Sequence, residues 1–309
     1  MNVVKSVCDI SQRRYEQLES RFEPEMGVYW AIMKPQPRPS FGATLLGDLN
    51  AFIDGIIQSR GQITHNGELH SVNYAILASK IPGVFNLGGD LGLLRTAILD
   101  RDRAQLERYA QMCVDDLYPW NRNFDLPVTT ISLVQGTALG GGFEAALASS
   151  VVVAEESCKM GFPEVLFNLF PGMGAYSFLQ RKVGRRITEE LIVSGNLYSA
   201  RQLYDMGVVD VITADGTGEA AVANYVRKHC RGSHGRRAFE RVRRDFEAVT
   251  RDELFHITRV WVDAAMHLSE RDLRMMERLI RAQERTGVAS LLPHPTAAQP
   301  RLNAVGAND

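Results

Sequence analysis

Two glutamates, Glu144 and Glu164, have the residue type and the local setting for proton transfer. Glu164 lies within an apolar segment, residues 161–167, which would desolvate its carboxyl group and raise its pKa towards neutrality if it faces inward. Glu144 follows three consecutive glycines at the start of an expected helix. Each also has an ordinary reading, because Glu144 can be a first-turn acid favoured by the helix dipole and Glu164 an acid exposed in a turn.

Two glycine-rich turns could supply the backbone donors that such acids need. Gly88-Gly89-Asp90 follows one expected strand, and Gly136 to Gly142 follows another. Glycine lets the backbone approach a ligand closely, and an N–H at a helix start can bond a developing oxyanion. A tight turn that needs glycine for its dihedral angles is the alternative. Nucleotide binding at the second turn is disfavoured, because that stretch has neither a dinucleotide-binding nor a Walker pattern.

The elements that must position these residues alternate between strand and helix. Apolar periodicity and β-branched runs predict helices over 45–60, 91–120 and 143–150, and strands over 72–81, 84–87, 128–135 and 151–154. This alternation continues to about Ile212 and predicts an α/β protein with a mostly parallel sheet. We expect four regions along the chain: an N-terminal arm (1–26), a core with the active site (27–215), a C-terminal helical region (216–290) and a mobile tail (291–309).

Composition sets limits on the class of protein. The chain has 309 residues, 45% of them hydrophobic and 23% charged, with a formal net charge of −1. These values are ordinary for a soluble globular protein and favour neither nucleic acid nor an anionic membrane as a partner. The cysteines, at positions 8, 113, 158 and 230, are far apart and predict no metal site. Neither a signal peptide nor a run long enough to cross a bilayer is present, so we expect a cytoplasmic protein.

Three segments together resemble the crotonase (enoyl-CoA hydratase/isomerase) superfamily. They are Gly88-Gly89-Asp90, then Gly140-Gly141-Gly142-Phe143-Glu144, then Pro163-Glu164 followed by Pro171-Gly172-Met173-Gly174. The resemblance covers about residues 72–212, and it includes a later segment with Gly195, Ala200 and Gly207-Val208-Val209. It implies a crotonase-like ββα superhelix with a C-terminal helical region that acts as a pocket lid or in oligomerisation.

The resemblance also assigns roles to the residues that match its motifs. It makes the N–H groups of Gly89 and Gly141 the oxyanion hole for a thioester carbonyl, and Glu144 and Glu164 the catalytic acids. Because both acids are kept, it favours the addition or removal of water at C2–C3 of an acyl thioester. No cofactor and no metal are implied.

Some features depart from a common hydratase, and these resemble the diffusible signal factor synthases. They include Leu87-Gly88-Gly89-Asp90, Gln135-Gly136 where asparagine-glycine is usual, and the long N-terminal arm. Such synthases make cis-2-unsaturated fatty-acid quorum-sensing signals from 3-hydroxyacyl-acyl carrier protein, which requires both dehydration and thioester hydrolysis. Residues expected to line an acyl pocket, or to be ordinary core, are Leu139, Met173 and Trp261.

The implied partners follow from this subfamily. Acyl carrier protein is acidic, so basic clusters at Arg181, Lys182, Arg185 and Arg186 and over 227–251 are candidate docks, although solvated helix faces explain such clusters as well. A sensor-kinase receiver domain and a homotrimer or hexamer are further expectations from the resemblance. A plain enoyl-CoA hydratase of fatty-acid metabolism, with CoA substrates, and a non-catalytic kinase partner are the alternative functions.

Overall fold

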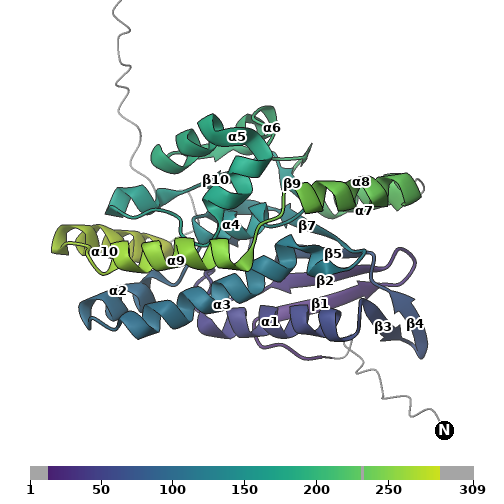
Figure 1. Ribbon diagram of the computed structural model, residues 1–309, viewed down its shortest axis with the longest axis horizontal. Coiled ribbons are helices and arrows are strands. Elements are labelled where there is room, and N and C mark those ends of the chain that lie inside the picture. The colour runs from purple at the N-terminus through teal and green to yellow at the C-terminus, as the bar shows by residue number, and fades with distance from the viewer. Residues whose placement is uncertain (1–12, 231–232, 286–309) are drawn as a thin grey trace, which may run out of the picture.

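The computed structural model describes residues 13–230 and 233–285. Strands form a six-stranded sheet, a four-stranded sheet and a two-stranded hairpin, and helices pack around them (Figure 1). The predicted α/β class is confirmed. Within the described ranges, no helix is long and apolar enough to cross a membrane.

The larger sheet has six strands, with β1 at one edge and β12 at the other. In spatial order its strands are β1 (Leu18–Glu23), β2 (Val28–Met33), β5 (Tyr74–Ser79), β7 (Thr129–Val134), β9 (Val151–Glu155) and β12 (Val211–Thr213). Strand β1 is antiparallel to β2, and the other neighbours are parallel. Every residue of β7 and β9 is buried, which explains why these strands read as continuous apolar or β-branched runs.

The smaller sheet brings the motif segments together. Its strands, in spatial order, are β11 (Leu197–Ser199), β10 (Lys159–Gly161), β8 (Gly136–Leu139) and β6 (Gly83–Asn86). Because β6, β8 and β10 are parallel, their carboxyl ends lie at the same edge of the sheet. The first half of the predicted turn from Gly136 to Gly142 is strand β8, so the second glycine turn is Gly140 to Gly142. This turn, Gly88-Gly89 and Pro163-Glu164 all follow these strands at that edge.

Helices cover both faces of the sheets and surround the site. They are α1 (Ala43–Gln58), α2 (Leu91–Leu99), α3 (Arg103–Asn121), α4 (Gly141–Leu147), α5 (Ala175–Val193), α6 (Ala200–Asp205), α7 (Gly218–Cys230), α8 (Ser233–Phe246), α9 (Arg251–Ala265) and α10 (Glu270–Arg285). Short 3-10 turns are η2 (Asn123–Asp125) and η3 (Pro163–Phe167), and the separate hairpin is β3 (Gln62–His65) with β4 (Glu68–Ser71). In Figure 1, α9 lies along α3 and α10 lies beside α2.

The two faces of the larger sheet are buried against different elements. Alternate residues of β2 point to opposite faces, so Trp30 joins one apolar cluster and Tyr29 joins the other. Val222 and Val226 of α7 pack in the cluster with Trp30. The larger cluster, on the other face, contains residues of α1, α3 and α4 and forms the main core.

The structure corrects the predicted extent of the N-terminal arm. Part of the expected N-terminal arm is strand β1, which pairs along its whole length with β2 and buries Leu18. Its mixed sequence, LESRFE, gives little periodic signal because β1 is an edge strand with one buried position. Helix α7 lies in the expected C-terminal helical region and packs against the six-stranded sheet. The predicted mobile tail, 291–309, lies outside the described residues.

The long helical stretch predicted over 91–120 is two helices. Helix α2 ends at Leu99 and α3 begins at Arg103. Arg101 between them has a φ of 55°, which no helix accommodates, and the Asp102 side chain accepts a hydrogen bond from the Gln105 N–H to cap α3. The break lets α2 and α3 take different directions around the site.

Candidate active site

The first glycine turn is held by side chains around it. The Asn86 side chain accepts a hydrogen bond from the Gly88 N–H at 2.8 Å, and Gly88 has a φ of 91°, which favours glycine. Asp90 then caps α2, because its carboxylate accepts from the N–H groups of Gly92 and Leu93. The turn is therefore fixed on both sides of Gly89.

The second glycine turn depends on glycine for close packing. Gly140 has a φ of 51°, and a β-carbon there would stand 2.2 Å from Oε1 of Glu164. A β-carbon on Gly142 would stand 2.1 Å from the carbonyl oxygen of Asn86. Larger residues at these positions would push the second turn away from both the first turn and Glu164.

The two turns bring the predicted oxyanion amides next to each other. A β-carbon on Gly88 would lie 3.1 Å from the Gly141 nitrogen, and one on Gly141 would lie 3.5 Å from the Gly89 nitrogen. Gly141 is the first residue of α4, where N–H groups have no partner within the helix. The hydrogen bonds of the described residues use neither the Gly89 nor the Gly141 N–H. Both donors are thus available to one acceptor.

Glu144 is held in a fixed, buried position one turn into α4. Its Oε1 accepts hydrogen bonds from the backbone N–H groups of Met173, at 2.8 Å, and Ala175, at 2.9 Å. Burial raises the pKa of Glu144 to about 7, while hydrogen bonds from Ala175, Met173 and Gly174 oppose this rise. A carboxyl group with this pKa can donate or accept a proton near neutral pH.

Glu164 reaches the same space from η3. Its side chain is half-buried, but its Oε2 is buried and makes no hydrogen bond within the described part of the chain. Burial, and then the charge of Glu144, raise the pKa of Glu164 to about 8. Near neutral pH the two acids therefore hold about one proton between them, so one is ready as an acid and the other as a base.

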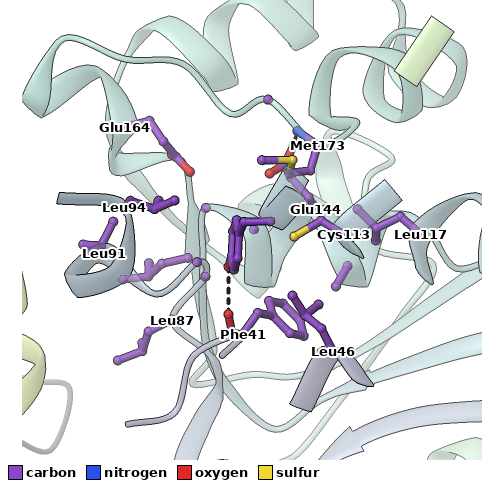
Figure 2. A pocket seen from close by; sticks show the side chains of 18 of the residues that line it. Phe41, Leu46, Leu87, Leu91, Leu94, Cys113, Leu117, Glu144, Glu164 and Met173 are labelled. Carbon is purple, nitrogen blue, oxygen red and sulfur yellow. Dashed lines mark hydrogen bonds between the residues drawn. The ribbon is translucent and has the colours of Figure 1, made fainter. Parts of the chain in front are cut away.

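All the predicted site residues line one cavity, which has a volume of about 110 Å³. Figure 2 shows Glu144 and Glu164 facing this space from different segments. Gly89 and Gly141 border it as well. The three predicted acyl contacts, Leu139, Met173 and Trp261, are buried and also line it. The tertiary structure thus joins residues that are up to 172 positions apart, from Gly89 to Trp261.

Sequence reasoning missed Tyr109, which supports the first glycine turn. Its hydroxyl donates to the Phe41 carbonyl at 2.7 Å, the hydrogen bond that ends at the labelled Phe41 in Figure 2, and accepts from the Asp90 N–H at 3.2 Å. The helical period placed Tyr109 on the buried face of α3. Its hydrogen bonds could not be foreseen, because both partners come from segments distant in sequence.

We expect Glu144→Gln to stabilise the fold more at about pH 8 than at about pH 5. The folded pKa of Glu144 is raised from 4.5 to about 7, so its favourable contribution is complete below pH 4.5 and is lost as pH rises through about 7. Glutamine does not titrate, so the unfolding free energy of the variant should gain about 2–3 kcal/mol over the wild type between these conditions. Denaturant unfolding at both pH values measures this difference.

The exposed Glu156→Gln variant is the matched control, and it should show little pH-dependent difference from the wild type. A Glu144→Gln stability change that is equal at both pH values would contradict a raised pKa for Glu144.

Comparison with known structures identifies the fold. The structure is similar to an enoyl-CoA hydratase from Bacillus halodurans, with a TM-score of 0.70 and 19% identity, over 85% of this chain and 100% of that chain. It is also similar to Pseudomonas aeruginosa DspI, with a TM-score of 0.60 and 20% identity, over 71% of this chain and 76% of that chain. These similarities confirm the predicted crotonase fold.

Sequence comparison gives the family. The probable mitochondrial enoyl-CoA hydratase 2 of Arabidopsis thaliana is 33% identical over 155 residues, which are 50% of this chain and 49% of that protein. This chain thus spans about half the length of the first curated relatives it matches. The family model described as enoyl-CoA hydratase/isomerase matches residues 47–278, well over half of the chain. This protein therefore belongs to the enoyl-CoA hydratase/isomerase family.

Proposed function

We propose that this protein dehydrates a 3-hydroxyacyl thioester carried by acyl carrier protein and then hydrolyses the thioester. The product is a free cis-2-unsaturated fatty acid that acts as a diffusible quorum-sensing signal. The observation that supports the chemistry best is the site itself: two carboxyl groups with pKa values of about 7 and 8 face one cavity. Beside them are two glycine amides that bond to no other group in the described ranges.

The first step removes water across C2–C3. The thioester oxygen accepts hydrogen bonds from the N–H groups of Gly89 and Gly141, which stabilise the enolate-like charge that develops when C2 loses a proton. The ionised member of the Glu144–Glu164 pair takes that proton. The protonated member gives its proton to the departing C3 hydroxyl, which leaves as water.

The second step releases the acid. Water adds to the thioester carbon, one glutamate takes its proton, and the tetrahedral oxyanion occupies the same pair of amides. The carrier thiol then leaves with a proton. Direct attack by water requires no nucleophilic side chain, and both acids are already in place beside the carbonyl.

The cavity supports a fatty-acyl substrate, because it continues away from the acids between α1 and α3. Its lining there is mostly apolar and includes Leu46, Leu49, Ile53, Leu117 and Trp120. Met173 and Trp261 border it on the side of α5 and α9. We propose that this region holds the acyl tail.

Two basic stretches remain candidate docks for the carrier protein, and ion pairs reduce the positive charge of both. In segment 227–251, Arg241 lies 3.9 Å from Asp245 and Arg251 pairs with Asp115. The other candidate is the cluster Arg181, Lys182, Arg185 and Arg186. In that cluster, Arg181 lies 2.9 Å from Glu253 and Lys182 lies 2.7 Å from Asp210. Arg185 and Arg186 lie within 4 Å of glutamates one turn further along α5. These pairings reduce the positive charge that the cluster presents to an acidic partner.

A plain enoyl-CoA hydratase is the second candidate, and the names of the matched family and of its curated relatives favour it. The same acids and amides would then add water to an enoyl-CoA without cleaving the thioester. In this reading the site chemistry is unchanged and only the fate of the thioester differs.

One assay separates the two functions. We expect purified protein incubated with 3-hydroxyacyl-acyl carrier protein to release free cis-2-enoic acid, detected by mass spectrometry. A parallel reaction with enoyl-CoA, followed in both directions, tests hydration. Reversible hydration without release of any free acid would contradict the synthase and support the hydratase.

A further inference from the structure

A third acid, Asp116, lines the same cavity in the part that the proposed chemistry does not use. Its side chain is 6% exposed, and neither carboxyl oxygen makes a hydrogen bond within the described part of the chain. The Asn50 side chain of α1 is its polar neighbour and lowers the pKa of Asp116 as a hydrogen-bond donor would, although neither carboxyl oxygen of Asp116 has a hydrogen bond by geometry. A buried carboxyl group without hydrogen bonds lowers the stability of the folded protein. We therefore expect Asp116 to have a hydrogen-bond partner when a ligand occupies the cavity.

The position of Asp116 follows from α3, which forms one wall of the cavity. The residues of α3 that line it recur at helical spacing and are Tyr109, Cys113, Asp116, Leu117 and Trp120. Tyr109 lies at the first glycine turn, since its hydroxyl oxygen is 3.1 Å from where a β-carbon on Gly89 would lie. At about 1.5 Å of rise per residue, Asp116 lies about 10 Å further along the helix. It therefore faces the acyl tail and not the thioester.

The surroundings of Asp116 favour its neutral form. Burial raises the pKa of Asp116 well above its usual range, Asn50 opposes this rise, and the charges of Asp115 and Asp54 add to it. A protonated carboxyl group has one O–H donor and retains acceptor oxygens. A hydroxyl group likewise donates one hydrogen bond and accepts others, so the two groups can pair reciprocally.

We propose that Asp116 recognises a hydroxyl group on the acyl tail, so that the preferred substrate is an acyl thioester that carries an oxygen far from its C3 position. The apolar residues around Asp116, such as Leu49, Ile53 and Leu117, would contact the methylene groups on either side of this oxygen. An unsubstituted alkyl tail would bury Asp116 without satisfying it. This inference rests on the proposed acyl-thioester function and adds a specificity for the tail.

Binding of unreactive analogues tests the inference separately from catalysis. The probes are 2-oxoalkyl thioethers on acyl carrier protein, which keep a carbonyl but have no thioester bond to cleave. One series carries a tail hydroxyl at successive carbons from mid-chain to the far end, and the other has plain alkyl tails. We expect the best hydroxylated probe to bind about 10-fold more tightly than its alkyl counterpart by isothermal titration calorimetry.

Asp116→Leu should remove that preference, bringing the ratio of the two dissociation constants to about one. Asp115→Leu is the matched control, because it removes the neighbouring acid, which does not line the cavity, and it should keep the preference. Asp116→Asn retains a donor and an acceptor and should keep part of it. Equal binding of both series by the wild type, or a preference that survives Asp116→Leu, would overturn the inference.

A binding outcome and an unfolding measurement show whether the proposed function or only the role of Asp116 is wrong. If neither series binds, the proposed acyl-thioester function is wrong together with this inference. Equal binding of both series by the wild type contradicts only the inference.

The unfolding free energy of Asp116→Leu tests whether Asp116 has a structural role instead. We expect the variant to be at least as stable as the wild type, because it removes an unsatisfied buried group. A marked loss of stability would assign Asp116 to the packing of α1 on α3 and overturn substrate recognition.

Discussion

Replacing Glu164 by glutamine should lower the rate of dehydration of a 3-hydroxyacyl thioester by about 10²–10⁴-fold, and replacing Glu144 should do the same. Glutamine keeps the shape of the side chain but cannot take or give a proton at these pH values. Each variant therefore breaks one half of a pair that holds about one proton near neutral pH. Single-turnover kinetics with a carrier-bound substrate would isolate the loss in the chemical step.

Binding and folding should survive these substitutions, so the loss should fall on kcat. The Met173 and Ala175 N–H groups still find an acceptor in the glutamine oxygen of the Glu144 variant. Glu156→Gln, on the surface, is the control and should retain full activity. Dehydration at a near wild-type rate by either active-site variant would show that Glu144 and Glu164 do not act as the proposed pair.

Gly141→Pro should reduce turnover by about 10²–10³-fold relative to Gly141→Ala, because proline removes one N–H of the proposed oxyanion hole. Gly141 is the first residue of α4, the helical position at which proline is best tolerated. A proline ring carbon would also stand where the N–H hydrogen points. The comparison of kcat between the two variants measures the combined effect of losing this donor and of placing a ring carbon where the acceptor would bind.

The alanine variant makes this comparison sharp. A β-carbon on Gly141 has its nearest contact at 3.5 Å, an ordinary van der Waals distance, so alanine keeps the turn and the N–H. Both variants carry that β-carbon, and only proline lacks the donor. Equal activity of the two variants would mean that the Gly141 N–H does not stabilise the transition state.

The active-site segments could be predicted from sequence because each one has a strong local cause. Glycines that need a positive φ, such as Gly88 and Gly140, and glycines that need close contact, such as Gly142, leave a recognisable pattern. The buried strands before them read as apolar runs for the same local reason. These signals were enough to predict the α/β class and the candidate segments, and the resemblance to the crotonase superfamily then assigned the two acids and the two amides.

Other features depend on contacts between distant segments and had no local signal. Edge strand β1 is held by backbone pairing with β2, and α7 lies on the sheet because Val222 and Val226 meet side chains of strands far away in sequence. Tyr109 binds the backbone at Phe41 and Asp90, and Asp116 is buried on α3, which packs against α1.

The sequence by itself determined which residues could do chemistry, because side-chain type and backbone freedom are properties of single positions and short turns. The tertiary structure alone decided how those residues behave. The parallel pairing of β6, β8 and β10 brought two acids and two amides to one cavity, and burial there raised the pKa values of Glu144 and Glu164 towards neutrality. Desolvation depends on everything that surrounds a group, so no local pattern encodes it.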